Sequence, residues 1–383
     1  MISTWEQRKL GEVVEFLDTM RKPLEGAKRI SGPYPYYGAS GIVDYVDGYL
    51  FDEELILLSE DGANITDRNY PVCFLTSGKY WVNNHAHVLK TKEGNENNFI
   101  CNSLERKDYK QYNTGMAMPK LNQEVCKGIP ISCPTFAEQK KIGDYFRRLD
   151  HLITLHQRKL EHVKKMKKSM LQKMFPKKNQ LYPEVRFPGF TDAWEQRKLE
   201  DIYGSIGNAF VGTATPYYVE SGHFYLESNN IKDGQINHNT EVFINDEFYE
   251  KQKDKWLHTG DMVMVQSGHV GHAAVIPEEL NNSAAHALIM FRNPKKEIEP
   301  YFLNYQYQTL KSKKKIENIT TGNTIKHILA SEMQQFEVDM PELAEQKKIA
   351  EYFRALDHLI TLHQRELDHL QLLKKGMLQQ MFI

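Results

Sequence analysis

Apolar residues recur at seven-residue intervals in two long stretches of this chain, residues 134–175 and 341–382. Two adjacent rows of such positions form one stripe, and a heptad-spaced stripe predicts a long helix that packs along a helical partner. Thr135 with Glu138 three residues later is a helix start signal, and Pro176 is a stop signal. The predicted packing positions are Ile142, Phe146, Leu149, Ile153 and Leu160 in the first stretch and Ile349, Phe353, Leu356, Ile360 and Leu367 in the second.

The two stretches are copies of one another. They are identical at 29 of 42 aligned positions, and a shorter repeat, WEQRKL, occurs at residues 5–10 and 194–199. Such a repeat predicts a duplicated architecture. Because each helix carries one stripe and the stripes match, we expect the helices to pack on each other as an antiparallel coiled coil, in a pseudo-two-fold arrangement.

The repeats divide the chain into five segments. We call the segment that ends with each WEQRKL repeat a frame start. The repeats predict a first variable domain (1–133) that begins with the first frame start (1–10), a central long helix (134–175), a connector that includes the second frame start (176–199), a second variable domain (200–340) and a C-terminal long helix (341–383). The connector is rich in Pro and Gly, which is typical of a turn between repeated units.

The variable segments alternate short apolar runs with Gly, Asn and Asp turns, which predicts mixed α/β domains and an overall α+β class. Two short signatures relate them. Residues 85–89 (HAHVL) match residues 286–290 (HALIM), and residues 114–120 (TGMAMPK) match residues 321–327 (TGNTIKH). We therefore expect two versions of one domain, separated by the two long helices.

Charge is distributed unevenly, although the net charge is only −1. Residues 134–178 hold 13 basic and 4 acidic residues, whereas residues 11–133 and 200–340 carry net charges of −4 and −7. The basic run is typical of a solvated helix face, of phosphate contact or of docking to an acidic partner. If the variable domains bind nucleic acid, their positive surface must be local, for example at Lys311-Ser312-Lys313-Lys314-Lys315.

Aromatic and polar clusters in the predicted loops contain side chains of the kinds that contact base edges and phosphates. Ordinary loops have similar compositions, so these residues are candidates only. They are Tyr37, Ser40, Lys79, Tyr80, Asn83, Asn84, Thr114 and Lys120 in the first variable domain, and Asn229, Asn230, Lys232, Gln266, Ser267, His269, Thr321, Asn323, Thr324 and Lys326 in the second.

Motifs for catalysis, metal binding and membrane insertion are missing. The sequence has no phosphate-binding loop, no His-Glu-x-x-His and no Gly-x-Ser-x-Gly, and none of its four cysteines forms a C-x-x-C pair. No apolar run approaches the roughly 18 residues of a spanning helix. We expect a non-catalytic, cytoplasmic binding protein with no metal site.

The layout resembles the specificity (S) subunit of type I restriction-modification systems, the HsdS family. The resemblance lies in the two WEQRKL openings, the P-x-x-x-E-Q-x-x-I starts of both long helices at residues 134–142 and 341–349, the FPGF of residues 187–190, and the two divergent inserts. It covers essentially the whole chain.

The resemblance implies that each insert is a target-recognition domain that reads one half of a split, asymmetric site in double-stranded DNA. The long helices would set the unread spacer and dock the methylation subunits. Two modification subunits, which use S-adenosylmethionine, and two restriction subunits, which use ATP and magnesium, would be the partners. This chain would itself hold no cofactor.

One departure and two alternatives remain open. Nine residues that precede Trp194 have no counterparts before Trp5, so either the C-terminal helix completes the N-terminal edge of the frame or the start is truncated. The acidic inserts are also compatible with a non-DNA adaptor that carries two protein-binding domains on a coiled-coil spacer. A nuclease with a divergent active site is the other alternative.

Overall fold

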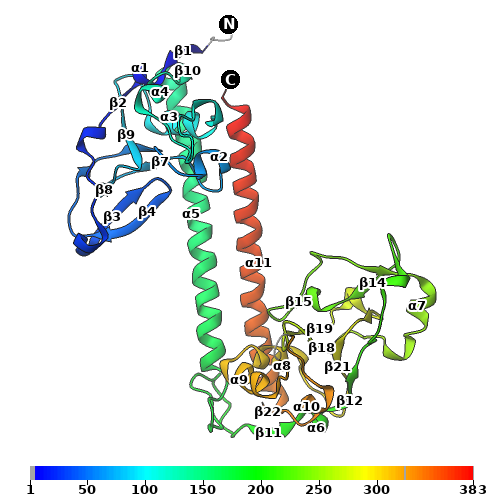
Figure 1. Cartoon of the computed structure of the whole chain (residues 1–383). Coiled ribbons are helices and arrows are strands. Elements are labelled where there is room, and N and C mark those ends of the chain that lie inside the picture. Colours follow the sequence, from blue (N-terminus) through cyan, green and yellow to red (C-terminus); the bar gives the residue numbers. More distant parts are fainter. Residues whose placement is uncertain (1–4, 323–324, 383) are drawn as a thin grey trace. The chain divides into compact units, whose positions relative to one another are not determined.

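The computed structural model describes residues 5–322 and 325–382. The chain forms two compact units (Figure 1). Unit 1 comprises Met1–Arg158 and His363–Ile383, and unit 2 comprises Lys159–Leu362. Each unit therefore combines one variable domain with a part of both long helices.

Unit 1 contains two four-stranded sheets and a short strand pair. One sheet has the order β2 (Val14–Phe16), β9 (Ala86–Thr91), β6 (Leu55–Ser59), β7 (Cys73–Thr76), and the other has the order β4 (Gly41–Val46), β3 (Ser31–Gly38), β8 (Lys79–Val82), β5 (Phe51–Asp52). The pair joins β1 (Glu6–Lys9) to β10 (Pro130–Cys133). The short helices are α1 (Leu10–Val13), α2 (Asn64–Asp67), α3 (Asn97–Glu105) and α4 (Gln123–Lys127).

Unit 2 repeats this plan with more elements. Its sheets have the orders β12 (Tyr203–Asn208), β21 (Leu288–Pro294), β18 (Met262–Val265), β19 (Ala273–Val275) and β13 (Tyr218–Val219), β17 (Phe243–Ile244), β14 (His223–Leu226), β20 (Ala284–Ala285). Two strand pairs join β11 (Glu195–Lys198) to β22 (Glu337–Met340) and β15 (Ile231–Lys232) to β16 (Gln235–Ile236). Its short helices are α6 (Leu199–Ile202), α7 (Asp246–Glu250), α8 (Pro300–Tyr307), α9 (Leu310–Ile319) and α10 (Ala330–Gln334).

The two variable domains are versions of one domain, as predicted. The β2-β9-β6-β7 order of unit 1 recurs as β12-β21-β18-β19 in unit 2. Specific contacts recur as well: the Lys92 and Lys295 ammonium groups each donate to a carbonyl oxygen of the adjoining short helix, Gly11 and Glu200, at 2.7 Å in both units.

The predicted alignment of the two histidine signatures is wrong by one residue. The backbone N–H groups of Leu121 and Ile328 donate to the carbonyls of Glu60 and Gln266, which makes those two positions equivalent. The preceding residues, Ser59 and Val265, face Ala86 and Leu288, whereas the sequence match aligns Ala86 with Ala287. Ala287 has a positive φ of 53°, a local backbone irregularity that a sequence match does not reveal.

The long helices are α5 (Phe136–Lys173) and α11 (Leu343–Gln380), each of 38 residues and within three residues of the predicted bounds. In unit 1 the first half of α5 shares a core with the last turns of α11, and in unit 2 the last turns of α5 share a core with the first half of α11. The helices are thus antiparallel within each unit. Eight of the ten predicted packing positions are buried, and Ile153 and Ile360 are half-buried.

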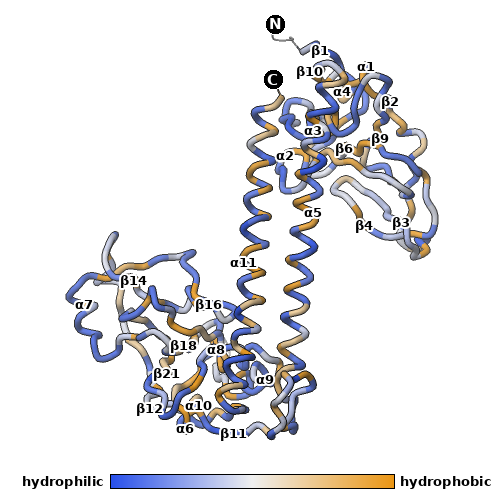
Figure 2. The backbone as a smooth tube through the Cα atoms, turned by 180° about the vertical axis from the view of Figure 1, so that it is seen from behind, coloured by the Kyte–Doolittle hydropathy of each residue, from blue (hydrophilic) through white to orange (hydrophobic). Residues whose placement is uncertain are grey.

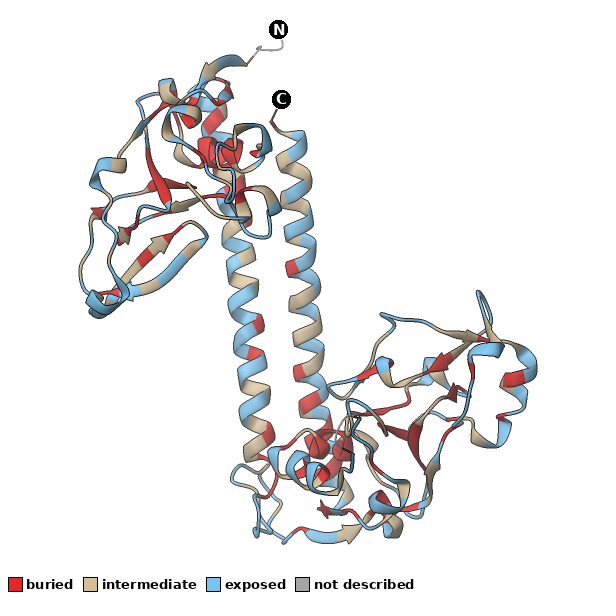
Figure 3. Ribbon diagram, in the orientation of Figure 1, coloured by how far each residue is buried: buried red, intermediate tan, exposed pale blue. Residues whose placement is uncertain are grey.

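Hydrophobic and buried residues alternate with polar, exposed ones along both helices (Figures 2 and 3). Thr135 caps α5 as predicted, because its hydroxyl accepts a hydrogen bond from the Glu138 N–H at 3.4 Å. None of the helices in the described ranges is long and apolar enough to cross a membrane.

The end of the C-terminal helix packs into the core of the first variable domain, as one of the two expectations for the frame has it. The Phe382 ring lies within 6.2 Å of three aromatic rings in unit 1, those of Trp5, Phe99 and Phe146. In unit 2 the Phe175 ring lies within 6.1 Å of the three counterparts, Trp194, Phe302 and Phe353. The same four-ring cluster therefore closes both units, once with the end of α5 and once with the end of α11.

Candidate nucleic-acid interface

Four loops of unit 1 converge at one end of its main sheet, and we call them loop cluster 1: residues 38–41, 60–64, 83–85 and 114–120. Backbone hydrogen bonds hold them together. The Glu60 N–H donates to the His85 carbonyl at 2.9 Å, and the Gly62 N–H donates to the Pro119 carbonyl at 3.0 Å. Asp61 forms an antiparallel bridge with Lys120. The β6 strand is buried and ends inside this cluster, and the loop that follows it is mostly half-buried.

Loop cluster 2 is the counterpart in unit 2 and consists of residues 228–233, 266–272 and the described part of 321–327. Ser267 bridges His327, and the Gly268 N–H donates to the Lys326 carbonyl at 3.0 Å. The backbone groups of Thr321 and His327 exchange two hydrogen bonds at 2.9 and 2.8 Å. Gly322 is required at the head of this loop, since its φ is +95° and an added Cβ would meet the Ile325 carbonyl.

Most of the candidate residues lie in these clusters. Loop cluster 1 contains the exposed residues Ser40, Asn84, Thr114 and Lys120, and loop cluster 2 contains the exposed residues Asn229, Lys232, His269, Thr321 and Lys326 and the half-buried Gln266 and Ser267. Three described candidates lie outside them: Tyr37, Lys79 and Tyr80. Lys79 sits at the start of β8 with its ammonium 4.7 Å from the centre of the Tyr49 ring, and Tyr37 packs its ring against Phe74.

Three candidates are buried, in contrast to the exposure that the sequence predicted for them. Tyr80 lies in the sheet core, where its ring stacks on Phe51. Asn83 is buried, and its side-chain oxygen accepts the His85 N–H at 2.8 Å. Asn230 is buried, and its amide donates to two backbone carbonyls. The sequence predicted exposed loops here, but the Asn83 and Asn230 side chains turn inward to bond the backbone. Asn323 and Thr324 lie outside the described residues.

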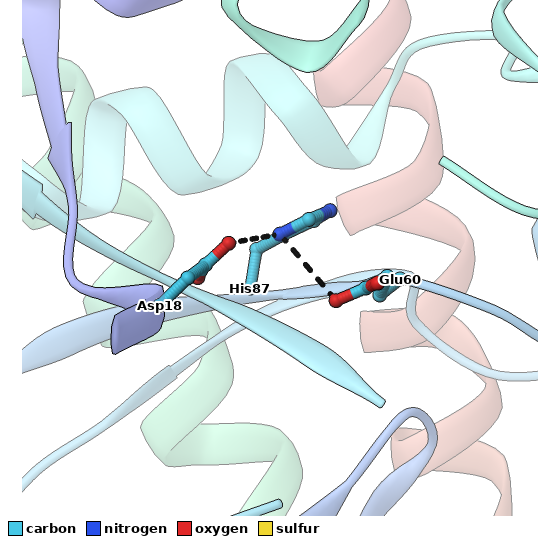
Figure 4. Close-up of side chains that lie close together, drawn as sticks. All are labelled: Asp18, Glu60 and His87. Atoms are coloured by element: carbon cyan, nitrogen blue, oxygen red, sulfur yellow. Dashed lines mark hydrogen bonds and ion pairs between the residues drawn. The ribbon is translucent and has the colours of Figure 1, made fainter. Parts of the chain in front are cut away.

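An ionic network that the sequence did not predict supports loop cluster 1 (Figure 4). The His87 imidazole lies 2.6 Å from the Asp18 carboxylate and 3.8 Å from that of Glu60. The Arg21 guanidinium bonds both carboxylates, at 3.3 and 2.6 Å, and the Lys120 ammonium lies 3.4 Å from Glu60. Three cations thus face two carboxylates. Only Asp18 and Arg21, three residues apart, are close enough in the sequence to suggest a part of this network.

The protonated form of His87 is the one that this network favours. Burial alone would lower the His87 pKa, but hydrogen bonds to Asp18 and to the Cys126 thiol, with the charge of Asp18, raise it to about 10. Its other ring nitrogen faces the Leu121 carbonyl at 2.8 Å. Although the ligand atoms of Asp18, Glu60 and His87 lie within 4.8 Å of one another, a metal ion would have to displace that proton and Arg21. The cluster therefore acts as a structural brace.

Loop cluster 2 gathers positive charge in an acidic domain. Burial lowers the pKa of His272, Asp233 opposes this, and the positive charges of Lys313, His269 and Lys232 lower it further. His272, Lys313 and Lys326 also line a cavity of about 340 Å³. Lys311, from the same basic run, is not free, because its ammonium pairs with the Asp339 carboxylate at 2.5 Å. The local positive surface thus comes from several loops rather than from one run.

The arrangement suits contact with a polyanion that also presents hydrogen-bonding edges. Amide, hydroxyl and imidazole groups such as those of Gln266, Ser267 and His269 bond base edges in the major groove, and lysines bond phosphates. The shared backbone frame holds both clusters in the same form, while the side chains that they present differ.

Comparisons with known proteins agree with this organisation. The family model for the type I restriction modification DNA specificity domain matches residues 2–165 and 191–372. The chain is 26% identical over 365 residues to a putative type I restriction enzyme specificity subunit of Haemophilus influenzae, covering 93% of this chain and 89% of the relative. It is 22% identical over 395 residues to the MjaVIII specificity subunit of Methanocaldococcus jannaschii, covering 97% and 90%.

Solved structures share the fold. The crystal structure of the type I restriction-modification S subunit from M. genitalium covers 100% of this chain and 97% of its own, with a TM-score of 0.73 at 13% identity. A structure from a study of complex assembly and conformational transition in a type I system reaches 0.51 at 15% identity, covering 98% and 97%. Since the family model matches both variable domains and both frames, this chain belongs to the family of type I restriction modification DNA specificity domains.

Proposed function

We propose that this chain is the DNA-recognition subunit of a type I restriction-modification complex, in which each variable domain reads one half of a bipartite, asymmetric site. One observation carries the proposal: the two loop clusters share their backbone bonds but present different side chains. Asp61 and Lys120 stand in cluster 1 where Ser267 and His327 stand in cluster 2. Different side chains on one frame suit two different half-sites.

The long helices set the spacer between the half-sites and dock the other subunits. A helix pair of fixed length joins two readers so that binding by one raises the effective concentration of the other. The partners are two modification subunits, which use S-adenosylmethionine, and two restriction subunits, which use ATP and magnesium. Methylation and cleavage take place on those partners, in the cytoplasm, and this chain holds no cofactor.

Exchange of one variable domain tests whether each domain recognises its half of the site independently. Residues 11–133 are replaced by the corresponding domain of another family member, and the methylated sites of a host that carries the complete system are mapped by single-molecule sequencing. We expect one half of the site to change and the other half and the spacer to persist. A change in both halves would contradict the proposal.

A protein-binding adaptor is the second candidate, because both variable domains are acidic. Salt dependence separates the two functions. Phosphate contacts release counterions, so the DNA affinity of the assembled complex should fall steeply as salt concentration rises. The absence of such a salt-dependent affinity for DNA would favour the adaptor.

A further inference from the structure

The His85 imidazole stands in loop cluster 1, and 51% of its side-chain surface is exposed. Its Nδ1 lies 2.9 Å from both carboxylate oxygens of Asp61. Because an ionised carboxylate only accepts hydrogen bonds, this contact places the proton of the neutral ring on Nδ1. Nε2 therefore keeps its lone pair, and it forms no hydrogen bond with any described residue.

The backbone of His85 is fixed as well. Its N–H donates to the Asn83 side-chain oxygen at 2.8 Å, and its carbonyl accepts the Glu60 N–H at 2.9 Å. Asp61 is itself held in place, because it forms an antiparallel bridge with Lys120. Every polar group of His85 except Nε2 is thus engaged within loop cluster 1. The free acceptor is therefore held in position before a ligand arrives, which lowers the entropy cost of binding.

The other histidine of the paired sequence signatures has no nitrogen to spare. The His286 Nδ1 lies 3.3 Å from the Glu227 carboxylate, and its Nε2 lies 3.0 Å from the Gly212 carbonyl. Its side chain is 25% exposed. Both nitrogens of His286 bond within unit 2, which is a structural role, whereas His85 keeps one nitrogen for a ligand.

Loop cluster 2 presents different chemistry at the positions of the His85–Asp61 pair. The residue equivalent to His85 is Ala287, because the strand register pairs the residues that follow each of them in the same way. Ser267 stands where Asp61 does. The pair therefore gives loop cluster 1 a fixed acceptor that loop cluster 2 lacks at these positions.

We propose that His85 is a specificity-determining residue, whose Nε2 accepts a hydrogen bond from the exocyclic amino group of an adenine or a cytosine in the half-site that unit 1 reads. This inference rests on the proposed function. In the major groove adenine N6 and cytosine N4 donate hydrogen bonds, whereas guanine O6 and thymine O4 accept them. An acceptor of fixed polarity separates the first two bases from the other two. Asp61 is a positioning residue, because it fixes the tautomer of the ring.

Methylation mapping in a host that carries the complete system identifies the position that His85 reads. The unmodified chain, His85→Ala and His223→Ala are compared by single-molecule sequencing. We expect His85→Ala to accept other bases at one position of one half-site, where the unmodified chain requires adenine or cytosine on one strand. The other half-site and the spacer should persist.

His223→Ala is the matched control. Its ring is also partly exposed, at 39%, and its Nε2 lies 2.9 Å from the Asp246 carboxylate. His223 belongs to β14 and lies outside both loop clusters. The variant should therefore keep the complete site.

A base analogue tests the contact in the assembled complex. Purine in place of adenine, or pyrimidin-2-one in place of cytosine, removes the exocyclic amino group at the mapped position. The affinity of the unmodified complex should fall about tenfold more than that of the His85→Ala complex, which has already lost the contact. Effects of the analogue on the duplex itself are common to both complexes and cancel. Asp61→Asn should narrow the discrimination between the two pairs of bases, because its amide can donate to Nδ1 as well as accept from it.

Equal losses with the analogue in both complexes would overturn the proposal, and so would an unchanged site for His85→Ala. A loss of affinity that is uniform over all sequences would assign His85 to a phosphate contact and would also overturn it. These outcomes leave the proposed function standing. If the unmodified complex methylated no bipartite site, the proposed function would fail and this inference with it.

Discussion

Loop clusters 1 and 2 share a backbone frame but are held in different ways. In unit 1 the loop after β6 is held by ion pairs, in which the buried His87, the half-buried Arg21 and the exposed Lys120 surround two carboxylates. In unit 2 the equivalent position of Glu60 is Gln266, and the strand residues opposite β18 are apolar. The comparison shows that the same backbone arrangement forms with either ionic or neutral residues beneath the loops. The side chains on the loop surface can therefore differ while the fold stays the same.

The largest expected effect distinguishes the ionic support of loop cluster 1 from the neutral support of loop cluster 2. Asp18→Ala removes a partner of both Arg21 and His87 and leaves them buried without it. Loss of one partner from a buried ionic pair costs about 3–5 kcal/mol. We expect the free energy of unfolding of unit 1 to fall by that amount, while unit 2 keeps its stability. Hydrogen exchange, read separately for each unit, measures this.

Lys79→Ala, at an exposed position outside the network, serves as its control. If Asp18→Ala changed protection by no more than Lys79→Ala does, the network would not brace loop cluster 1.

A second pair of variants tests whether the four-ring aromatic cluster stabilises both units to the same extent. Phe382→Ala should destabilise unit 1 and Phe175→Ala should destabilise unit 2, each by about 3 kcal/mol, because each removes one ring from a four-ring cluster. Hydrogen exchange in each unit provides the readout. An effect of Phe382→Ala on unit 2 alone would refute the closure of unit 1 by α11.

The pH dependence should differ between the units for a physical reason. His87 has a folded-state pKa of about 10, above the ordinary value of 6.5. Its stabilising contribution is therefore fully present below about pH 6.5 and is lost as the pH rises towards 10. Thermal unfolding between pH 6.5 and 9.5 should show unit 1 losing stability relative to unit 2.

His87→Gln, which cannot carry the charge, should remove this difference in pH dependence while lowering stability at pH 6.5. Equal pH profiles of the two units in the unmodified chain would show that His87 does not titrate as described.

The smallest expected effect concerns DNA. Lys326→Ala should weaken binding of the assembled complex to its target by about 1 kcal/mol and reduce the salt dependence by about one counterion, since it removes one phosphate contact. Lys120→Ala should have less effect, because Lys120 is already paired with Glu60 at 3.4 Å. Fluorescence anisotropy across a salt series measures both affinities. A larger loss of affinity for Lys120→Ala than for Lys326→Ala would show that Lys120 is the stronger phosphate contact.

The long helices and the repeat could be predicted because heptad spacing and identity at 29 of 42 positions are local properties of the sequence. The convergence of residues 266–272 with the loop that starts at Thr321 depends on strand pairing between distant segments. Only the matching Thr-Gly signatures hinted at it.

Burial within loops was the part that the sequence could not supply. Asn83 and Asn230 have the same composition signal as the exposed Asn84 and Asn229 beside them. Which member of each pair turns inward is decided by backbone carbonyls and N–H groups that happen to need a partner. The ionic network of His87 was missed for a related reason, since its members come from segments that are far apart along the chain.

The closure of unit 1 by Phe382 has a consequence for synthesis on the ribosome. Trp5, Phe99 and Phe146 emerge early, but the ring that completes their cluster is translated only after all of unit 2. Unit 2, whose residues are contiguous, is finished first, although its variable domain comes second. A nascent chain that stops short leaves the amino-terminal domain with an unsealed core, which exposes defective products to proteolysis before they can compete for partners.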